Sequence, residues 1–345
     1  MLTASEEKII EFAKNPADGL KIVVIGGGTG LSTLLRGLKL YSNNLTAIVT
    51  VADNGGSSGM LREDMGILPP GDIRNCILAL ADTEPLMSDL LNFRFKDGRL
   101  RGQNFGNLLI AAMNEVSGNF TEAVRNVSKV LAVKGRVLPV SLNNIQIVAR
   151  LRDQTEIVGE YEIGHRQANA DNPIEEIVML PEGAEALPEA IEALKTADVI
   201  VIGPGSLYTS IIPNLLFTEI CRAITVSNAV KIHVANIMTQ PAETMGYDAA
   251  HHLTAILQHA RLKNARGFID YVIVSNAWIA PELIERYQLQ SAVPVNANLE
   301  SVRQLGTTVV EAPLACVSNG VIRHDHTVLA RTVLCLALER PGPIS

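Results

Sequence analysis

The sequence predicts an α/β fold: a Rossmann-like, mainly parallel sheet with helices on both faces and an inserted hairpin and helical cluster. Short apolar runs, typical of buried strands, alternate along the chain with longer segments whose apolar residues recur at helical spacing. Two of these runs, residues 21–25 and 199–202, end in glycine-rich turns that lead directly into a helical segment. Repeated strand–turn–helix units build parallel sheets, because the helix carries the chain back to the start of the next strand.

The expected elements, taken in chain order, define one large domain. Residues 1–20 are mixed and acidic, unlike a signal peptide, and we expect a short amphipathic lead-in helix there. A single Rossmann-like nucleotide-binding domain is expected over residues 21–338, with an insert at about 141–180 and a tail at 339–345. An antiparallel hairpin is expected from residues 145–151 and 156–161. Further strands are expected at residues 45–51, 136–140, 231–235 and 271–274, and helical segments at 73–133, 247–262 and 327–338.

Composition narrows the class of protein. The 345 residues are 47% apolar and 19% charged, and the formal net charge is −7. The chain has no stripe rich in lysine or arginine, which disfavours a nucleic-acid partner. No apolar run approaches the roughly 20 residues that cross a bilayer, so we expect no membrane insertion. The four cysteines are scattered without a C-x-x-C pair, which favours buried thiols in a reducing cytoplasm over a zinc site or a disulfide framework.

The first glycine turn is a candidate phosphate site. The apolar run is followed by Gly26, Gly27, Gly28, Thr29 and Gly30, after which leucines recur at helical spacing. Unpaired N–H groups and the positive end of the helix converge at such a turn, which suits a phosphate or pyrophosphate. The dinucleotide pattern G-x-G-x-x-G is not matched, because Leu31 stands in place of its third glycine. The P-loop pattern is not matched either, because the lysine that it requires is absent from this turn. A tight turn without a ligand is the structural alternative.

The glycine-rich loop expected over residues 52–71 is a second candidate. Asp53 follows Gly30 at roughly the spacing of about 20 residues at which Rossmann-type units place an acidic side chain on ribose hydroxyls. With Asn54, it is expected to accept hydrogen bonds from a sugar. Ser57 and Ser58 add hydroxyl donors among glycines that permit unusual backbone angles. A solvated surface loop is the alternative.

Polar side chains also begin the helical segments that follow. Asp72 is expected either as the N-cap of a helix beginning at Ile73 or as a carboxylate that faces substrate or Mg²⁺ beside Asp53. Arg74 and Asn75 lie in the first helical turn, where a phosphate could meet them. Three asparagines at strand ends or helix starts are candidates for helix caps or for ligand contacts: Asn104, Asn107 and Asn143.

The second glycine turn repeats the pattern of the first. The apolar run at residues 199–202 leads into Gly203, Pro204, Gly205, Ser206, Tyr208 and Thr209. Ser206 is expected to cap the helix, and the N–H groups behind it suit a second phosphate or a carboxylate. Two such turns on one sheet predict one elongated anionic ligand or two neighbouring ligands.

Six segments taken together carry a family resemblance: GGGTG, DNGGSSG, GDIRN, NFGN, GPGSLYTS and NIMTQPAETMGY. Their order and spacing, over roughly residues 20–335, resemble the bacterial gluconeogenesis factor family, also called the YvcK family. That family is similar in fold to 2-phospho-L-lactate transferases, which move a phospholactyl or phosphoenolpyruvyl group from a guanosine diphosphate carrier to a deazaflavin.

The resemblance implies a cytoplasmic protein that binds UDP-N-acetylglucosamine or an NAD-like dinucleotide and serves cell shape and wall synthesis during growth on gluconeogenic carbon. It adds Asn236 and Gln240, in the last of the six segments, to the candidate binding residues. Through the transferases it implies that Asp53 and Asp72 are placed to hold Mg²⁺. The tryptophan-containing deazaflavin loop of the transferases has no counterpart, because NGGSSG stands there and Trp278 is the only tryptophan.

These observations favour a regulator that binds a nucleotide-sugar, with both glycine turns as phosphate donors. The alternative is a Mg²⁺-dependent transferase of a phospholactyl or phosphoenolpyruvyl group from a nucleotide carrier, with Asp53 and Asp72 as the catalytic candidates. A scaffold with a vestigial pocket is a third interpretation. Small-molecule nucleotides are the expected ligands, and a homo-oligomer and cell-wall enzymes are the candidate protein partners.

Overall fold

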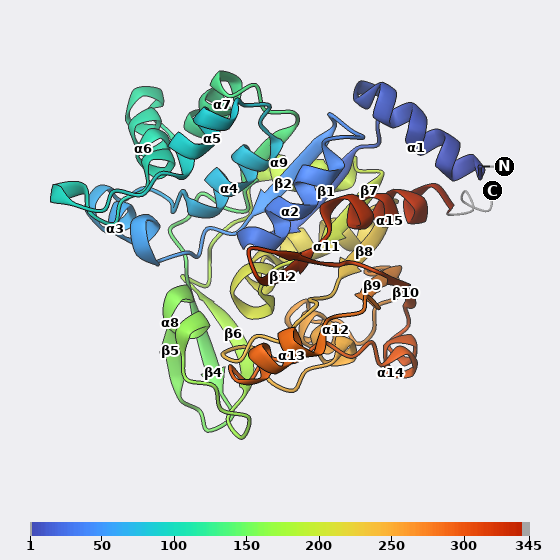
Figure 1. Ribbon diagram of the computed structural model, residues 1–345. Helices are drawn as coiled ribbons and strands as arrows, with labels where there is room; N and C mark the ends of the chain where they lie inside the picture. Colours follow the sequence, from blue (N-terminus) through green and yellow to red (C-terminus); the bar gives the residue numbers. More distant parts are fainter. Residues whose placement is uncertain (1, 340–345) are drawn as a thin grey trace.

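A seven-stranded, fully parallel sheet forms the centre of the molecule, as a computed structural model that describes residues 2–339 shows (Figure 1). Its strand order is β10-β9-β8-β7-β1-β2-β3. This confirms the predicted α/β class. The strands are β1 (Ile22–Gly26), β2 (Leu45–Val49), β3 (Arg136–Pro139), β7 (Val199–Ile202), β8 (Val230–Val234), β9 (Tyr271–Ser275) and β10 (Thr308–Ala312). All five residues of the central strand β1 are buried, as expected where helices cover both faces of a parallel sheet.

Two small antiparallel sheets lie outside the central one. The hairpin predicted at residues 145–161 is confirmed by β4 (Gln146–Leu151) and β5 (Glu156–Val158), which pair antiparallel. A third strand that the sequence analysis did not predict, β6 (Ile174–Leu180), pairs with the other edge of β4. The second small sheet, also not predicted, is a hairpin of β11 (Ala315–Ser318) and β12 (Val321–His324).

The helices complete the layers. They are α1 (Ala4–Lys14), α2 (Gly28–Leu38), α3 (Gly56–Met65), α4 (Gly71–Leu80), α5 (Pro85–Asn92), α6 (Phe105–Ser117), α7 (Phe120–Val130), α8 (Glu160–His165), α9 (Pro188–Lys195), α10 (Ile212–Leu215), α11 (Thr218–Val226), α12 (Ala249–His259), α13 (Pro281–Gln288), α14 (Leu299–Gln304) and α15 (His326–Glu339). Of the tail expected at 339–345, residues 340–345 lie outside the described residues. Within residues 2–339, no helix combines the length and the apolar character that a membrane span needs.

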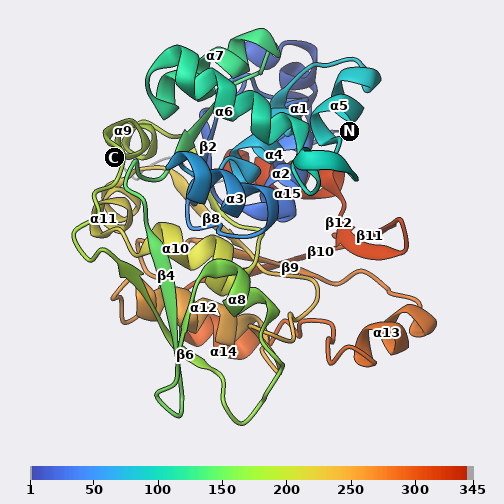
Figure 2. The same cartoon turned by 90° about the vertical axis from the view of Figure 1, so that its left-hand side faces the viewer.

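The direction of the chain through the sheet separates the helices into two layers. From β1 the chain moves outward to β2 and β3, and it then returns to the other side of β1 with β7 and moves outward again to β8, β9 and β10. Because parallel crossovers are right-handed, this reversal places the crossover helices of the two halves on opposite faces. Helix α2 packs against α4 and α15, whereas α11 packs against α9 and α10 (Figure 2). The reversal also leaves a crevice at the carboxyl ends of β1 and β7, where ligands bind in open α/β sheets.

Two local expectations about the first half are wrong. The segment expected as an open loop contains helix α3, so Ser57, Ser58 and Gly59 are helical residues. Helix α4 begins at Gly71, with Pro70 in the N-cap position, which places Asp72 in the first turn. Asp72 is therefore not the N-cap, and its carboxyl group is free to contact the neighbouring turn.

The helical turn after β7 is capped by a carboxylate from a distant segment. The backbone N–H of Tyr208 donates to Oε2 of Glu243 at 2.8 Å, and the Thr209 hydroxyl donates to Oε1 at 2.8 Å. Glu243 is 4% exposed, so these bonds form where water does not compete. Ser206 occupies the N-cap position, but its side chain makes no capping bond. The predicted serine cap is thus replaced by a glutamate cap from another part of the chain.

We predict that Glu243→Ala lowers the free energy of unfolding by about 2–3 kcal/mol, because it leaves buried donors of the turn without an acceptor. Urea denaturation followed by circular dichroism measures the change. Glu243→Gln keeps an acceptor oxygen and should lose less, and Glu285→Ala on the exposed side of α13 should stay within about 0.5 kcal/mol of the wild type. An unchanged unfolding midpoint for Glu243→Ala contradicts this account of the cap.

Candidate functional site

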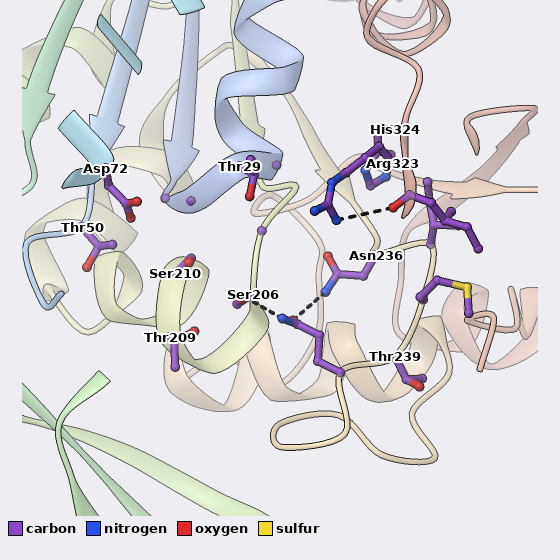
Figure 3. A pocket seen from close by; sticks show the side chains of 18 of the residues that line it. Thr29, Thr50, Asp72, Ser206, Thr209, Ser210, Asn236, Thr239, Arg323 and His324 are labelled. Carbon is purple, nitrogen blue, oxygen red and sulfur yellow. Dashed lines mark hydrogen bonds between the residues drawn. The ribbon is translucent and has the colours of Figure 1, made fainter. Parts of the chain in front are cut away.

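A cavity of about 430 Å³ lies at the carboxyl ends of β1 and β7, at the reversal of the strand order (Figure 3). The cavity is lined by the two glycine turns, the loops after β2 and β8, the first turn of α4, helix α8, helix α13 and the C-terminal hairpin. The lining residues that carry polar or charged side chains are Thr29, Thr50, Asp53, Asp72, Glu160, Ser206, Thr209, Ser210, Asn236, Thr239, Gln240, Tyr287, Arg323 and His324.

The two glycine turns touch one another, and this contact forms the floor of the cavity. A Cβ atom at Gly30 would lie 2.6 Å from the carbonyl oxygen of Pro204, and one at Gly27 would lie 2.5 Å from Oδ2 of Asp72. Gly28 has a φ of +67°, a backbone conformation that residues other than glycine rarely adopt. The glycines are therefore required by the packing of the turns as well as by the access they give a ligand to backbone N–H groups.

Three carboxyl groups gather along one side of the cavity. Oδ2 of Asp53 would lie 2.9 Å from a Cβ at Gly71, the residue that precedes Asp72. The Asp72 carboxyl accepts a hydrogen bond from the backbone N–H of Gly28, at the start of α2. Glu160 reaches the cavity from α8, beyond the far end of the hairpin.

Burial changes the ionisation of two of these groups. Burial, followed by the negative charge of Asp53, raises the pKa of Asp72 to about 6. Burial also raises the pKa of Glu160 to about 8, and the charges of Asp53 and Asp72 add to that shift. At neutral pH the Glu160 carboxyl is therefore mostly protonated and can donate a hydrogen bond, whereas Asp72 is mostly ionised.

The opposite side of the cavity carries the positive charge. Among the described residues that line the cavity, Arg323 on β12 is the one with a permanently charged cationic side chain. Its neighbour His324 is half-buried, and desolvation of the ring lowers the His324 pKa to about 4, so the ring is neutral at physiological pH. The hairpin is anchored by the backbone N–H of Ile322, which donates to the Tyr287 hydroxyl at 2.9 Å.

A chain of side-chain amides connects the second glycine turn to the loop after β8 (Figure 3). Nε2 of Gln240 donates to the Ser206 hydroxyl at 2.8 Å, and Nδ2 of Asn236 donates to Oε1 of Gln240 at 3.4 Å. Amides present both donors and acceptors, which suits recognition of a neutral, hydrogen-bonding group such as a nucleobase or a sugar.

The structure brings about half of the predicted binding residues to the cavity. Those that line it are Gly27, Gly28, Thr29, Gly30, Asp53, Asp72, Gly205, Ser206, Thr209, Asn236 and Gln240. The predicted residues that do not line it are Gly26, Asn54, Ser57, Ser58, Arg74, Asn75, Asn104, Asn107, Asn143, Gly203, Pro204 and Tyr208. Most of the side chains in the second group have partners within the protein.

The two serines that were expected to face a ligand support the loops instead. The Ser57 hydroxyl donates to Oε1 of Gln103 at 2.7 Å and accepts from the backbone N–H of Asn104. The Ser58 hydroxyl accepts from the backbone N–H of Gly71 at 3.1 Å. These bonds hold α3, α4 and the segment before α6 together beneath the cavity.

Arginine and asparagine candidates are likewise engaged inside the fold. Arg74 donates to the side-chain oxygens of Asn107 and Asn75 at 2.9 and 2.8 Å. Asn104 caps α6 by accepting from the backbone N–H of Asn107, which confirms the cap interpretation. Asn143 Oδ1 accepts from the backbone N–H of Glu185 at 2.8 Å.

Asn54 has a supporting role rather than the expected contact with a sugar. Its Oδ1 accepts from the backbone N–H of Tyr161, and its Nδ2 donates to Glu162, both at 2.8 Å. These bonds fasten α8 to the loop after β2. Asn54 thereby positions Glu160, the residue that opens α8.

The second glycine turn does not present the free anion site that its sequence predicts. The Tyr208 N–H and the Thr209 hydroxyl are occupied by Glu243, the protein's own carboxylate. The Tyr208 hydroxyl meets that of Tyr247 at 2.8 Å and is buried. The donors available to an anion are therefore concentrated at the first turn and at Arg323.

Sequence reasoning missed the residues contributed by distant segments. Glu160 comes from the insert, and Tyr287, Arg323 and His324 come from the C-terminal region. Glu160 follows Gly159, and Arg323 and His324 follow the Asn319-Gly320 turn of the β11–β12 hairpin, but none of these residues lies in a unit of strand, glycine turn and helix. The Asn319-Gly320 turn between two alternating segments was an available signal for the hairpin that carries Arg323. That pattern does not show which part of the molecule the hairpin approaches.

Metal ligation is limited to a pair of carboxylates. Within residues 2–339, no group of three or more His, Cys, Asp and Glu side chains is placed to hold a metal ion. Asp53 and Asp72 fit a Mg²⁺ ion that keeps several of its waters, because Mg²⁺ is often held by one or two carboxylates together with substrate phosphates. Burial is the main cause of the raised Asp72 pKa, and the negative charge of Asp53 adds to it; a divalent cation would relieve the repulsion between the two carboxylates.

A family model and individual relatives assign the chain to the same family. A model of the family 2-phospho-L-lactate transferase CofD matches residues 22–315. A relative from Thermoanaerobacterium thermosulfurigenes is 53% identical over 92% of this chain and 97% of its own length. The gluconeogenesis factor of Bacillus subtilis (strain 168) is 44% identical over 92% of this chain and 98% of its own length.

Solved structures agree with this relationship. The crystal structure of protein BH3568 from Bacillus halodurans matches with a TM-score of 0.87 and 42% identity, covering 92% of this chain and 100% of that one. BH3568 is described in a second structure as a member of the UPF0052 family. The chain therefore belongs to the CofD family, and within it to the group of proteins named gluconeogenesis factors.

Proposed function

We propose that the protein is a cytoplasmic regulator that binds a nucleotide-sugar of the UDP-N-acetylglucosamine type in the cavity at the strand reversal. The observation that carries the proposal is the arrangement of charge around that cavity. Helix N–H groups and Arg323 provide positive potential, and carboxyl groups and amides provide hydrogen-bonding partners on either side. A nucleotide-sugar has the matching sequence of groups: a base, a diphosphate and a polyhydroxylated ring.

The diphosphate would lie between the first turn and Arg323. The N-terminus of α2 offers the backbone N–H groups of Thr29 and Gly30, together with the positive end of the helix. Gly28 contributes less, because its N–H already bonds to Asp72. A guanidinium group such as that of Arg323 can bind a phosphate through two parallel hydrogen bonds.

The sugar and the base would occupy the two remaining sides. The Asp53 carboxyl oxygens and the protonated Glu160 offer acceptors and a donor for sugar hydroxyls. Asn236 and Gln240 offer amides to the edge of a base. The cavity volume of about 430 Å³ falls within the range of about 300–1,000 Å³ typical of ligand pockets.

The cellular role we propose follows from the relatives. The Bacillus subtilis relative is named gluconeogenesis factor, which supports a role in growth on gluconeogenic carbon. A wall precursor bound by a regulator would connect carbon supply to wall synthesis and cell shape, with cell-wall enzymes as candidate partners. This role requires reversible binding of the nucleotide-sugar and no turnover.

We predict that isothermal titration detects binding of UDP-N-acetylglucosamine and that Arg323→Ala weakens it at least tenfold, about the loss of one charge-assisted hydrogen bond. Arg303→Ala, an exposed arginine on α14 outside the cavity, is the matched control and should bind like the wild type. GDP and NAD complete the panel. If folded protein binds none of these nucleotides, the proposal is wrong.

Binding should also weaken in mildly alkaline solution. The raised pKa of Glu160, about 8, keeps its carboxyl neutral near pH 7. Ionisation as the pH passes 8 removes the proton that Glu160 would donate to a sugar hydroxyl and adds a negative charge to a cavity that binds an anion. If the protonated form alone binds, the Kd for UDP-N-acetylglucosamine rises about tenfold between about pH 7 and pH 9. Glu160→Gln, which stays neutral, should remove the rise, whereas the exposed Glu182→Gln should retain it. A flat pH profile for the wild type would exclude Glu160 from the ligand site.

A second candidate function is favoured by the closeness of Asp53 and Asp72. In this function the chain is a Mg²⁺-dependent transferase that moves a phospholactyl or phosphoenolpyruvyl group from a nucleotide carrier. The family model that matches the chain is named for a 2-phospho-L-lactate transferase. The paired carboxylates would hold the cation, which neutralises charge that develops on the phosphate during transfer. The raised Asp72 pKa supports this placement.

Phosphorus NMR distinguishes the two functions. With Mg²⁺ and an acceptor alcohol present, a transferase breaks the P–O–P bond of its carrier, joins the phospho-group to the acceptor oxygen and releases the nucleoside monophosphate, and Asp72→Asn abolishes this reaction. A regulator leaves a bound nucleotide-sugar intact for hours, with or without Mg²⁺, and Asp72→Asn retains or tightens binding because a negative charge is removed near the phosphates. Turnover that depends on both Mg²⁺ and Asp72 would establish the transferase.

A further inference from the structure

A second cavity, of about 510 Å³, lies beside the first residues of β9 and β10 and is called here the amino-end cavity. Its polar and charged side chains come from Arg266, Asp270, Tyr271, Thr307 and Thr308. None of these residues lines the cavity at the strand reversal. Because the strands are parallel, their amino ends lie at the opposite edge of the sheet from their carboxyl ends. The two cavities are therefore separate.

Two turns, one after α12 and one between α14 and β10, form the wall of the amino-end cavity. Helix α14 packs against both α12 and β10 (Figure 1). The backbone N–H of Ala265 donates to the carbonyl oxygen of Leu305 at 2.8 Å, which joins the two turns. Lys263, Arg266 and Arg303 are exposed on or beside these turns, and the turns themselves contain no acidic residue. This part of the surface therefore attracts anions.

The guanidinium group of Arg266 is held in place beside the cavity. A Cβ atom at Gly306 would lie 3.0 Å from Cγ and 3.5 Å from Nε of Arg266, so the arginine side chain lies against the Gly306 backbone. Within residues 2–339 the guanidinium group makes no hydrogen bond or ion pair. A packed arginine whose N–H groups are not engaged can bind a phosphate through two parallel hydrogen bonds.

Thr307, the residue after Gly306, supplies a second and independent indication of a ligand. Its side chain lines the cavity and is 8% exposed, and its Oγ1 has no hydrogen-bond partner among the described residues. Buried hydroxyl groups in native proteins nearly always have a partner. The Thr307 hydroxyl and the Arg266 guanidinium therefore offer hydrogen bonds to the same polar group.

Asp270 contributes the opposite chemistry. Its Oδ2 accepts from the backbone N–H of Lys231 at 2.9 Å, and its carbonyl oxygen accepts from the backbone N–H of Thr308 at 3.1 Å, so the residue is fixed. A carboxylate repels an anion but accepts hydrogen bonds from hydroxyl groups. A ligand that satisfies both Arg266 and Asp270 therefore combines an anionic group with hydroxyl groups.

We propose that the amino-end cavity binds the phosphate ester of a sugar or of another polyol. The phosphate contacts Arg266 and Thr307, and the hydroxyl groups contact Asp270 and Tyr271. A phosphate monoester carries nearly two negative charges at pH 7, which suits the basic turns. The cavity volume of about 510 Å³ lies within the range of about 300–1,000 Å³ typical of ligand pockets. The protein thus has a second ligand site, which is independent of the nucleotide-sugar.

Isothermal titration of the full chain with glycerol 3-phosphate and with glucose 6-phosphate tests the proposal. At least one ester should bind, and Arg266→Ala should weaken its binding at least tenfold, because a charge-assisted contact is lost. Thr307→Val should weaken binding about three- to tenfold without lowering the urea unfolding midpoint, because the valine removes a hydroxyl that has no partner in the fold. Arg99→Ala, at an exposed arginine between α5 and α6, is the matched control and should bind like the wild type.

Inorganic phosphate and glucose separate the two halves of the ligand. Each should bind at least tenfold more weakly than the better ester, since each satisfies only one side of the cavity. Inorganic phosphate that binds as tightly as the esters contradicts the polyol assignment. Folded wild type that binds neither ester, or binding that is unchanged in Arg266→Ala, overturns the proposal. The titration needs no nucleotide-sugar, so its failure is distinct from a failure of the proposed function.

Discussion

The close approach of the two glycine turns is the constraint on which the site depends. Gly30 stands against the carbonyl of Pro204, and Gly27 leaves no room for a side chain beside Asp72. These contacts exist because β1 and β7 are neighbours at the point where the strand order reverses. The floor of the cavity is thus a consequence of topology, and the glycines allow the backbones to meet there. Larger residues at these positions would separate the turns.

Features determined by short stretches of sequence were predicted well. The parallel sheet, the two glycine turns and the β4–β5 hairpin follow from local apolar patterns and turn residues, and the structure contains all of them. Eleven of the expected binding residues reach the cavity, and ten of them lie in the segments that follow β1, β2, β7 and β8, whose carboxyl ends meet at one edge of the sheet. The eleventh, Asp72, lies in the first turn of α4. The local sequence pattern was sufficient to predict a residue's place in the structure where that place depends only on a strand end or a turn.

Features that depend on a partner from a distant segment could not be predicted in this way. The Tyr208 N–H and the Thr209 hydroxyl have the sequence context of an anion site, but Glu243 occupies them. Ser57 has the context of a ligand donor, but Gln103 and Asn104 engage it. Glu160 and Arg323 enter the cavity from an insert and from a C-terminal hairpin, and no local pattern shows where either of these arrives.

The two sides of the cavity differ in charge, and this difference is the basis for the ligand that we propose for this member of the family. One side offers backbone N–H groups and a guanidinium, and the other offers carboxyl groups whose ionisation is shifted by burial. A crystal structure of the protein soaked with UDP-N-acetylglucosamine tests the central claim most directly. The account predicts diphosphate density between the α2 N-terminus and Arg323, with Glu243 still bonded to Tyr208. A diphosphate bound at the second turn in place of Glu243, or outside the cavity, would contradict it.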